Sequence, residues 1–159
     1  MKRCLTVFAA ALIFSAGSAP AATPDDMLVM AWQFDDIITL DPAEIFEFSG
    51  AEYAGNTYDR LIGYDVDNVE DIYGLAAESW TVGEDGKTYT FKIRDGMKFA
   101  SGNPVTAEDA AFSLQRTVIL NKSPGFILTQ FGFTPENVRD KIRAVDDHTL
   151  VLETDQAYA

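Results

Sequence analysis

The sequence contains very little cysteine, histidine or positive charge. Its 159 residues include one cysteine and one histidine, and 12 basic residues stand against 25 acidic ones, for a formal net charge of −13. A single cysteine excludes a disulfide framework and a thiolate zinc site, and a lone histidine excludes a pair of imidazole metal ligands. The negative charge argues against nucleic acid or an anionic membrane surface as a partner. With 47% hydrophobic residues, however, the chain is no disordered acidic tail.

Motifs for catalysis and for nucleotide or calcium binding are also missing. No serine lies in a G-x-S-x-G motif. Gly86-Lys87-Thr88 lacks the upstream glycine of a phosphate-binding loop, because Thr81 stands at that position. Residues 65–76 resemble a calcium loop but lack the required residue at three positions, Val69, Glu70 and Ala76. We therefore expect no enzyme activity, no metal site and no cofactor; a looser calcium site at 65–71 is the alternative to a solvated loop.

The first 21 residues have the pattern of a secretory signal peptide. Two basic residues precede an apolar run at 5–14, and Ala19-Pro20-Ala21 forms an A-x-A site with cleavage expected before Ala22. A membrane anchor is the alternative, but the run has only about half of the ~20 residues that span a bilayer. Cys4 precedes the run instead of following it, so we expect no lipid anchor.

Negative charge is concentrated in the first half of the expected mature chain. Cleavage removes two basic residues and changes the net charge to −15. Residues 22–86 hold 16 acids and one base, Arg60, whereas residues 87–159 hold nine of each. This asymmetry indicates a solvated acidic face that keeps an exported protein soluble. An acidic rim that favours cationic ligands is the alternative.

The order of expected elements predicts an α+β fold. Residues 28–34 are a short apolar run typical of a buried strand. Residues 51–61 are expected to form a helix, with one face made by Ala51, Ala54, Tyr58, Leu61 and Ile62. Apolar and polar residues alternate on both sides of a Gly83–Lys87 turn, which predicts a β-hairpin over 78–94.

The second half continues with helices and closes with another hairpin. Thr106–Asp109 has the composition of a helix start, with a hydroxyl cap and first-turn acids. A buried stripe should follow, made by Ala107, Ala110, Ala111, Leu114 and Val118. Another helix is expected to begin at Thr134-Pro135. Residues 142–145 and 149–154 should pair around a turn that contains His148.

Three stretches together carry a family resemblance. They are LAAESW at 75–80, DGKTYTFKIRDGMKF at 85–99 and PVTAEDAAFS at 104–113. They resemble the "LAESW", "DGxTYTFxLRxGVKF" and "TAEDVxFS" sequence motifs of extracytoplasmic solute-binding proteins of family 5. These are the peptide, dipeptide and nickel receptors of ABC importers. Leu40-Asp41-Pro42 and residues 145–150 match the family as well, so the resemblance covers essentially all of residues 28–156.

The resemblance implies a receptor made of two lobes that close on a ligand. Residues 22–159 would be the amino-terminal part of the solute-binding domain, an incomplete first lobe of the class II type with hairpins and short helices. The protein would be periplasmic, monomeric when full length, and would deliver a peptide or dipeptide to ABC permease subunits. Alternative cargoes are nickel, a sugar or an opine; a secreted hydrolase and a structural envelope protein are less favoured alternatives.

The resemblance also implies where a ligand would lie. Residues 75–113 would form an accessory subdomain away from the ligand. Ser49, Gly50, Ala51 and Glu52 stand where dipeptide receptors present a loop and helix start, and their amides could hold a peptide as helix starts hold carboxylates. The alternative is that Ser49 merely caps the following helix. Residues 30–34 could line the cleft floor, although burial in the core is the favoured interpretation.

Length is the one departure from the family. Members are several times longer, and the aspartate that pairs with the peptide's α-ammonium group belongs to their later part. We therefore interpret the sequence as an amino-terminal fragment and expect weak peptide binding, or none, by residues 22–159 alone.

Overall fold

A computed structural model describes residues 23–158, which divide into two units between Gln33 and Phe34. The predicted signal peptide, 1–21, lies outside the described residues. In the first unit, a turn is closed by a 2.9 Å hydrogen bond from the Met27 amide to the Pro24 carbonyl. None of the helices in the described part of the chain is long and apolar enough to cross a membrane.

The predicted strand at residues 28–34 is wrong. This stretch has no strand, and its large apolar side chains are exposed, with 85% of Leu28 accessible to solvent. A strand is stabilised by ladder hydrogen bonds to a neighbouring strand, and no described strand pairs with this stretch. Its apolar composition alone could not supply that partner. The core burial that we favoured for residues 30–34 is also wrong, because Met30, Trp32 and Phe34 are exposed.

The second unit is built on a four-stranded antiparallel sheet in the order β3-β4-β6-β5. Its strands are β3 (Ala77–Val82), β4 (Thr88–Ile93), β5 (Ile142–Asp146) and β6 (Thr149–Glu153). Both predicted hairpins are confirmed, and they meet where β4 pairs with β6, with Phe91 opposite Leu150. In the first turn, the Asp85 carboxylate accepts hydrogen bonds from the Lys87 and Thr88 amides at 2.9 and 3.1 Å.

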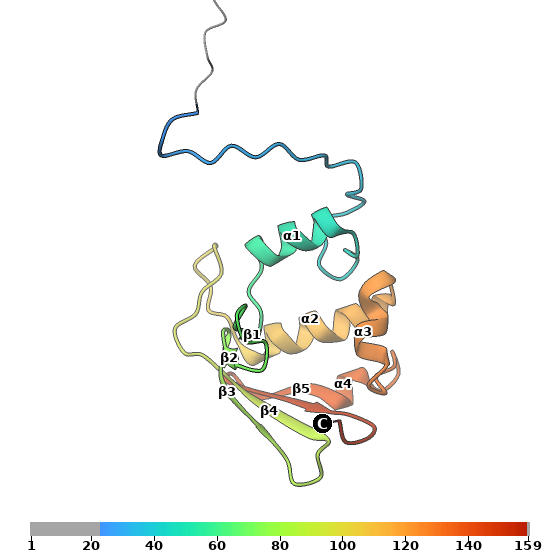
Figure 1. The fold of residues 1–159 in the computed structure, drawn as a ribbon. Coiled ribbons are helices and arrows are strands. Elements are labelled where there is room, and N and C mark those ends of the chain that lie inside the picture. The colour runs from blue at the N-terminus through green and yellow to red at the C-terminus, as the bar shows by residue number, and fades with distance from the viewer. Residues whose placement is uncertain (1–22, 159) are drawn as a thin grey trace, which may run out of the picture. The chain divides into compact units, whose positions relative to one another are not determined.

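Helix α2 (Ala107–Leu120) packs on β5 and β6 and completes the core (Figure 1). Its start is confirmed: the Asp109 carboxylate accepts hydrogen bonds from both the amide and the hydroxyl of Thr106, each 2.8 Å long. The predicted stripe is buried at Ala107, Ala111 and Val118 and partly buried at its other two positions. Sheet residues including Ile93, Ile142 and Leu150 lie in the same core.

Short helical turns connect α2 to β5. They are η1 (Ser123–Gly125), α3 (Phe126–Thr129) and α4 (Val138–Lys141). The helix predicted from Thr134 is wrong in its start, because residues 134–137 form a turn. The Asn137 side chain bonds the Thr134 amide at 2.8 Å and the Gly132 carbonyl at 3.0 Å, and such local bonds compete with helix formation.

Helix α1 (Phe48–Thr57) and the hairpin of β1 (Ile62–Tyr64) and β2 (Ile72–Gly74) precede the main sheet. The helix predicted over 51–61 is present, but it begins three residues earlier and ends four residues earlier. Its predicted apolar face is wrong at its carboxyl end, because Ile62 pairs with Gly74 in β1 and the Leu61 carbonyl accepts from the Leu75 amide at 3.0 Å. β pairing therefore takes up the residues that helical spacing had assigned to α1.

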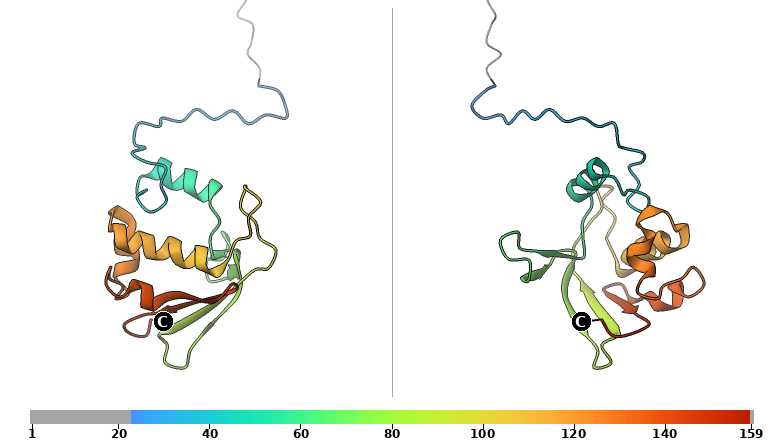
Figure 2. Two further views of the ribbon diagram at one scale, coloured as in Figure 1. Left: turned by 180° about the vertical axis from the view of Figure 1, so that it is seen from behind. Right: turned by 45° about the vertical axis from the view of Figure 1, so that its right-hand side comes forward.

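The elements of the second unit form layers. Helix α2 lies between the sheet on one side and α1 on the other, as the three views agree (Figures 1 and 2). The unit mixes helices with an antiparallel sheet, so the predicted α+β class is confirmed.

Candidate functional site

The four predicted ligand-binding residues all lie in the first two turns of α1 but differ in exposure. Ser49 and Gly50 are buried, whereas Ala51 and Glu52 are exposed. The residue that caps the helix is Glu47, and it makes no side-chain capping bond. The alternative role of Ser49 as the helix cap is therefore wrong, since Ser49 lies inside the helix. Ligand contact by these residues stays a prediction.

The Ser49 amide already has a carboxylate partner within the chain. It donates a 3.3 Å hydrogen bond to the Oδ2 atom of Asp36. Hydrogen bonding from the Ser49 side chain, and then from its amide, lowers the pKa of Asp36 below the usual range of aspartate. A carboxylate of the chain itself thus lies at this helix start. A ligand carboxylate that used the same amide would have to displace Asp36.

Gly50 is buried because another side chain occupies the space beside it. A Cβ atom added to Gly50 would lie 2.9 Å from Ile45 Cγ2 and 3.2 Å from a Glu47 carboxylate oxygen. The missing side chain therefore lets Ile45 pack against the first turn of α1. This internal packing is a sufficient reason for glycine at the position.

A compact turn around Asp41 leads into α1. The Asp41 carbonyl accepts hydrogen bonds from the Glu44 and Ile45 amides, both 2.9 Å long, and its carboxylate accepts a 3.0 Å bond from the Ala43 amide. Pro42 suits the turn because its fixed backbone angle matches the first corner position. Ala43 and Ile45 are buried, so the turn packs inward at these two positions.

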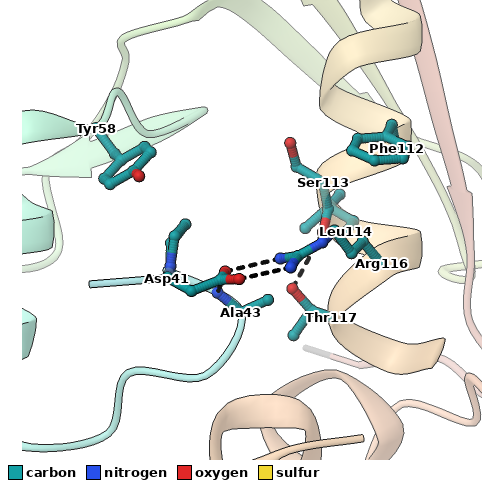
Figure 3. Close-up of a pocket in the computed structure, with 9 residues that line it drawn as sticks. Asp41, Ala43, Tyr58, Phe112, Ser113, Leu114, Arg116 and Thr117 are labelled. Carbon is teal, nitrogen blue, oxygen red and sulfur yellow. Dashed lines mark hydrogen bonds and ion pairs between the residues drawn. The ribbon is translucent and has the colours of Figure 1, made fainter. Parts of the chain in front are cut away.

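Arg116 of α2 holds this turn through a bidentate ion pair with the Asp41 carboxylate (Figure 3). Its two terminal nitrogens lie 2.7 and 2.5 Å from the two Asp41 carboxylate oxygens, and the two side chains are 35% and 31% exposed. The guanidinium, together with the Ala43 amide, lowers the pKa of Asp41 to about 2. The carboxylate in turn raises the pKa of Arg116. The pair joins residues 75 positions apart.

Sequence reasoning missed this ion pair. Leu40-Asp41-Pro42 was interpreted only as a turn and as part of a family pattern. One signal was available: Arg116 is the only basic residue between Lys98 and Lys122, and it lies on a helix. This isolated base is visible in the sequence, but the sequence does not show which of the many acids is its partner.

An open pocket of about 600 Å³ adjoins the ion pair. Its lining comes from the Asp41 turn, Tyr58 and the outer face of α2; the residues are Asp41, Pro42, Ala43, Tyr58, Phe112, Ser113, Leu114, Arg116 and Thr117 (Figure 3). The hydroxyls of Ser113 and Thr117 both donate to helix carbonyls, at 2.8 and 3.0 Å. None of residues 49–52 lines the pocket, so it is separate from the predicted ligand residues.

Polar clusters elsewhere have local structural roles. In the calcium-like loop, one Asp65 oxygen accepts from the Asp67 amide at 2.8 Å, and the Asn68 side chain bonds Asp71 at 2.9 Å. His148 lies in the predicted hairpin turn, and its amide donates to Asp146. Within residues 23–158, no group of three or more histidine, cysteine or acidic side chains could hold a metal ion.

Comparison with known proteins gives a family match and close relatives. The pattern of "Bacterial extracellular solute-binding proteins, family 5 Middle" matches residues 71–159. A probable D,D-dipeptide-binding periplasmic protein, DdpA of Escherichia coli (strain K12), is 34% identical over 166 residues, which cover 100% of this chain and 30% of that protein. The chain thus spans less than a third of the length of this relative.

Solved structures show the same fold. The substrate-binding domain of an oligopeptide ABC transporter from Bacillus anthracis str. Ames is 34% identical with a TM-score of 0.63, covering 75% of this chain and 24% of that one. Haemophilus influenzae OppA in complex with RPPGFSPFR is 26% identical with a TM-score of 0.66, covering 76% and 25%. These neighbours are bilobed periplasmic-binding proteins, and the helices and sheet described above are consistent with part of one lobe.

Proposed function

Because the chain belongs to the bacterial extracellular solute-binding proteins of family 5, we propose that it is part of a receptor that captures peptides or dipeptides for an ABC importer. The observation that carries this proposal is the likeness along the whole chain to a probable D,D-dipeptide-binding periplasmic protein. The fold likeness to an OppA that was crystallised with a peptide supports the same cargo class.

The proposed mechanism is capture by lobe closure. A hinge motion brings two lobes around the solute, and the closed receptor then presents it to the permease. A peptide bound in extended form is held mainly by main-chain hydrogen bonds, so that many side chains are tolerated. Such a mechanism needs no catalytic group. We infer that the protein is a binding component and not an enzyme.

The proposed ligand contacts of this chain are at the start of α1. Ala51 and Glu52 are exposed there, whereas Ser49 and Gly50 are buried in the first turn of the helix. The Glu52 carboxylate would add negative charge near a ligand amine. The acidic composition of residues 22–86 would favour cationic solutes in the same way.

The proposal includes an organisation and a location for the chain. Residues 1–21 would be removed as a signal peptide, and residues 22–159 would form the amino-terminal part of the first lobe. The receptor would work as a monomer in the periplasm, without a lipid anchor, and would dock on ABC permease subunits.

Native mass spectrometry of the full-length receptor, purified without added ligand, tests the cargo class. We expect the mass of a co-purified peptide, which tandem fragmentation would identify. Nickel, a sugar or an opine in its place would assign another cargo within the family. Deletion of the gene should also abolish growth on peptides as the nitrogen source, and unchanged peptide uptake would contradict the proposal.

A further inference from the structure

We propose that Arg116 is a positioning residue, which anchors residues 41–50 to α2 and so sets the place of the α1 start. The ion pair itself is seen in the structure; its importance for ligand capture rests on the proposed function. The inference is carried by three features: a rigid anchor on α2, a tightly connected turn at Asp41, and a second contact that fastens the same segment.

Arg116 projects from a helix that is firmly attached to the sheet. Ala111 and Val118 are fully buried, and the side chain of the buried Gln115 donates a 2.6 Å hydrogen bond to the Ile142 carbonyl of β5. The backbone of α2 that carries the Arg116 side chain is therefore held in a fixed position. An anchor on such an element sets the position of a loop more precisely than an anchor on another loop would.

The contacts of the Asp41 turn couple the position of Asp41 to that of the α1 start. The Asp41 carbonyl bonds the Ile45 amide, and Ile45 packs so closely on Gly50 that a Cβ at Gly50 would lie 2.9 Å from it. Gly50 follows Ser49, whose amide is bonded to Asp36. A shift of Asp41 would therefore displace the buried start of α1.

A ring contact fastens the same segment a few residues further on. Phe46 meets Phe126 of α3 edge to face, with ring centroids 5.5 Å apart and an interplanar angle of 80°. This pair alone allows the segment to pivot about it. The ion pair at Asp41 supplies a second point of attachment and restricts that pivot.

Arginine suits this role better than lysine. The planar guanidinium matches the carboxylate with two parallel hydrogen bonds, and this geometry fixes direction as well as distance. A lysine would keep the charge but contact the carboxylate at a single point. Arg116→Lys should therefore restore the anchor only partly.

Hydrogen exchange on the chain tests the anchor without any ligand. In Arg116→Gln we expect the Ile45 and Ser49 amides to exchange about three- to tenfold faster, since a partly buried charged pair is lost. The Ile93 amide in the sheet should be accelerated less than the Ile45 and Ser49 amides, and Arg116→Lys should lie between wild type and Arg116→Gln. The matched control is Arg143→Gln, which removes a similarly exposed 2.6 Å pair with Glu153 and should leave both test amides unchanged.

Two outcomes of the exchange experiment would overturn the positioning role. One is unchanged exchange at Ile45 and Ser49 in Arg116→Gln. The other is an equal acceleration at Ile93 in both Arg116 variants, including complete loss of protection, because Arg116 would then support the whole fold and not this segment.

A binding experiment on the full-length receptor separates this inference from the proposed function. With an equimolar mixture of di- and tripeptides as the probe, Arg116→Gln should raise the half-saturating concentration about three- to tenfold, and Arg143→Gln should not change it. A wild-type receptor that binds no peptide contradicts the proposed function. A wild-type receptor that binds, with Arg116→Gln binding equally well, contradicts the positioning role.

Discussion

Two glycines in α1, Gly50 and Gly55, have opposite effects on the stability of the fold. Gly50 is buried, and an added Cβ would meet Ile45 and Glu47 at 2.9 and 3.2 Å, whereas Gly55 is exposed and an added Cβ would meet nothing within 4 Å. Gly50 is thus required by packing. Gly55 only lowers the stability of the helix, because glycine has more conformational freedom to lose on folding.

Alanine substitutions at these positions should therefore change stability in opposite directions. We expect Gly55→Ala to raise the free energy of unfolding by about 0.5–1 kcal/mol. Gly50→Ala should lower it by about 1–3 kcal/mol, because the contact with Ile45 is overpacked. Urea unfolding measures both, with an unchanged m-value as the check that the two states are comparable. An unchanged or raised free energy of unfolding in Gly50→Ala would contradict the packing of Ile45 on Gly50.

The lowered pKa of Asp41 predicts that the stability of the folded chain depends on pH at low pH. The ion pair with Arg116 and the Ala43 amide lower its pKa from 3.8 to about 2 in the folded chain. A lowered folded-state pKa means that the stabilisation is fully present above the unfolded-state pKa and is lost as the pH falls toward the folded-state pKa. The stability difference between wild type and Asp41→Asn should therefore shrink from about pH 4 to about pH 2.

Urea unfolding of both proteins at a series of pH values measures this difference. Subtracting the variant cancels the contributions of the other carboxylates. A difference that stays constant across the range would show that Asp41 gains nothing from its ionised form in the folded chain.

At the scale of elements, α2 connects the sheet with the Asp41 turn. Two adjacent side chains of α2 bond to its two neighbours: Gln115 bonds β5, and Arg116 bonds Asp41. The hairpins on which α2 rests were predictable, because strand alternation and an Asp-Gly turn are local features. The carboxyl end of α1 was not, because Leu61 and Ile62 satisfy either a helical face or a β pair, and only the nearby β2 decides between them.

The bond from Gln115 should contribute measurably to the attachment of α2. Gln115→Met keeps the length of the side chain but removes the 2.6 Å bond to the Ile142 carbonyl. We expect the free energy of unfolding to fall by about 1–3 kcal/mol, because a buried acceptor loses its donor. The control, Gln130→Met, removes an exposed bond to the Ile127 carbonyl and should change stability by no more than about 0.5 kcal/mol. Equal effects in the two variants would contradict this role of Gln115.

At the scale of the whole molecule, the exposed apolar residues are the main departure from an ordinary soluble domain. Phe48, which directly precedes the proposed ligand residues, is 95% exposed, and Ile38 is 83% exposed. Surfaces of this kind usually meet a partner or another part of a protein. The chain covers 30% of the length of the probable D,D-dipeptide-binding relative.

Peptide binding by residues 22–159 alone should therefore be weak or undetectable. A bilobed receptor encloses its ligand between two surfaces, and the fold of residues 23–158 is consistent with part of one lobe. Isothermal titration calorimetry with di- and tripeptides is the measurement, with the full-length receptor as the positive control. Micromolar binding by residues 22–159 would show that these residues hold the complete site.

The sequence by itself determined the family, the α+β class, both hairpins of the main sheet and the start of α2, because each depends on local spacing or on a continuous pattern. Tertiary structure decided the rest. It left residues 28–34 outside the described strands, buried Ser49 and Gly50 while Ala51 and Glu52 stayed exposed, and joined Asp41 to Arg116 across 75 positions. Pairing between distant segments depends on which surfaces meet in space, and the composition of either segment alone does not contain that information.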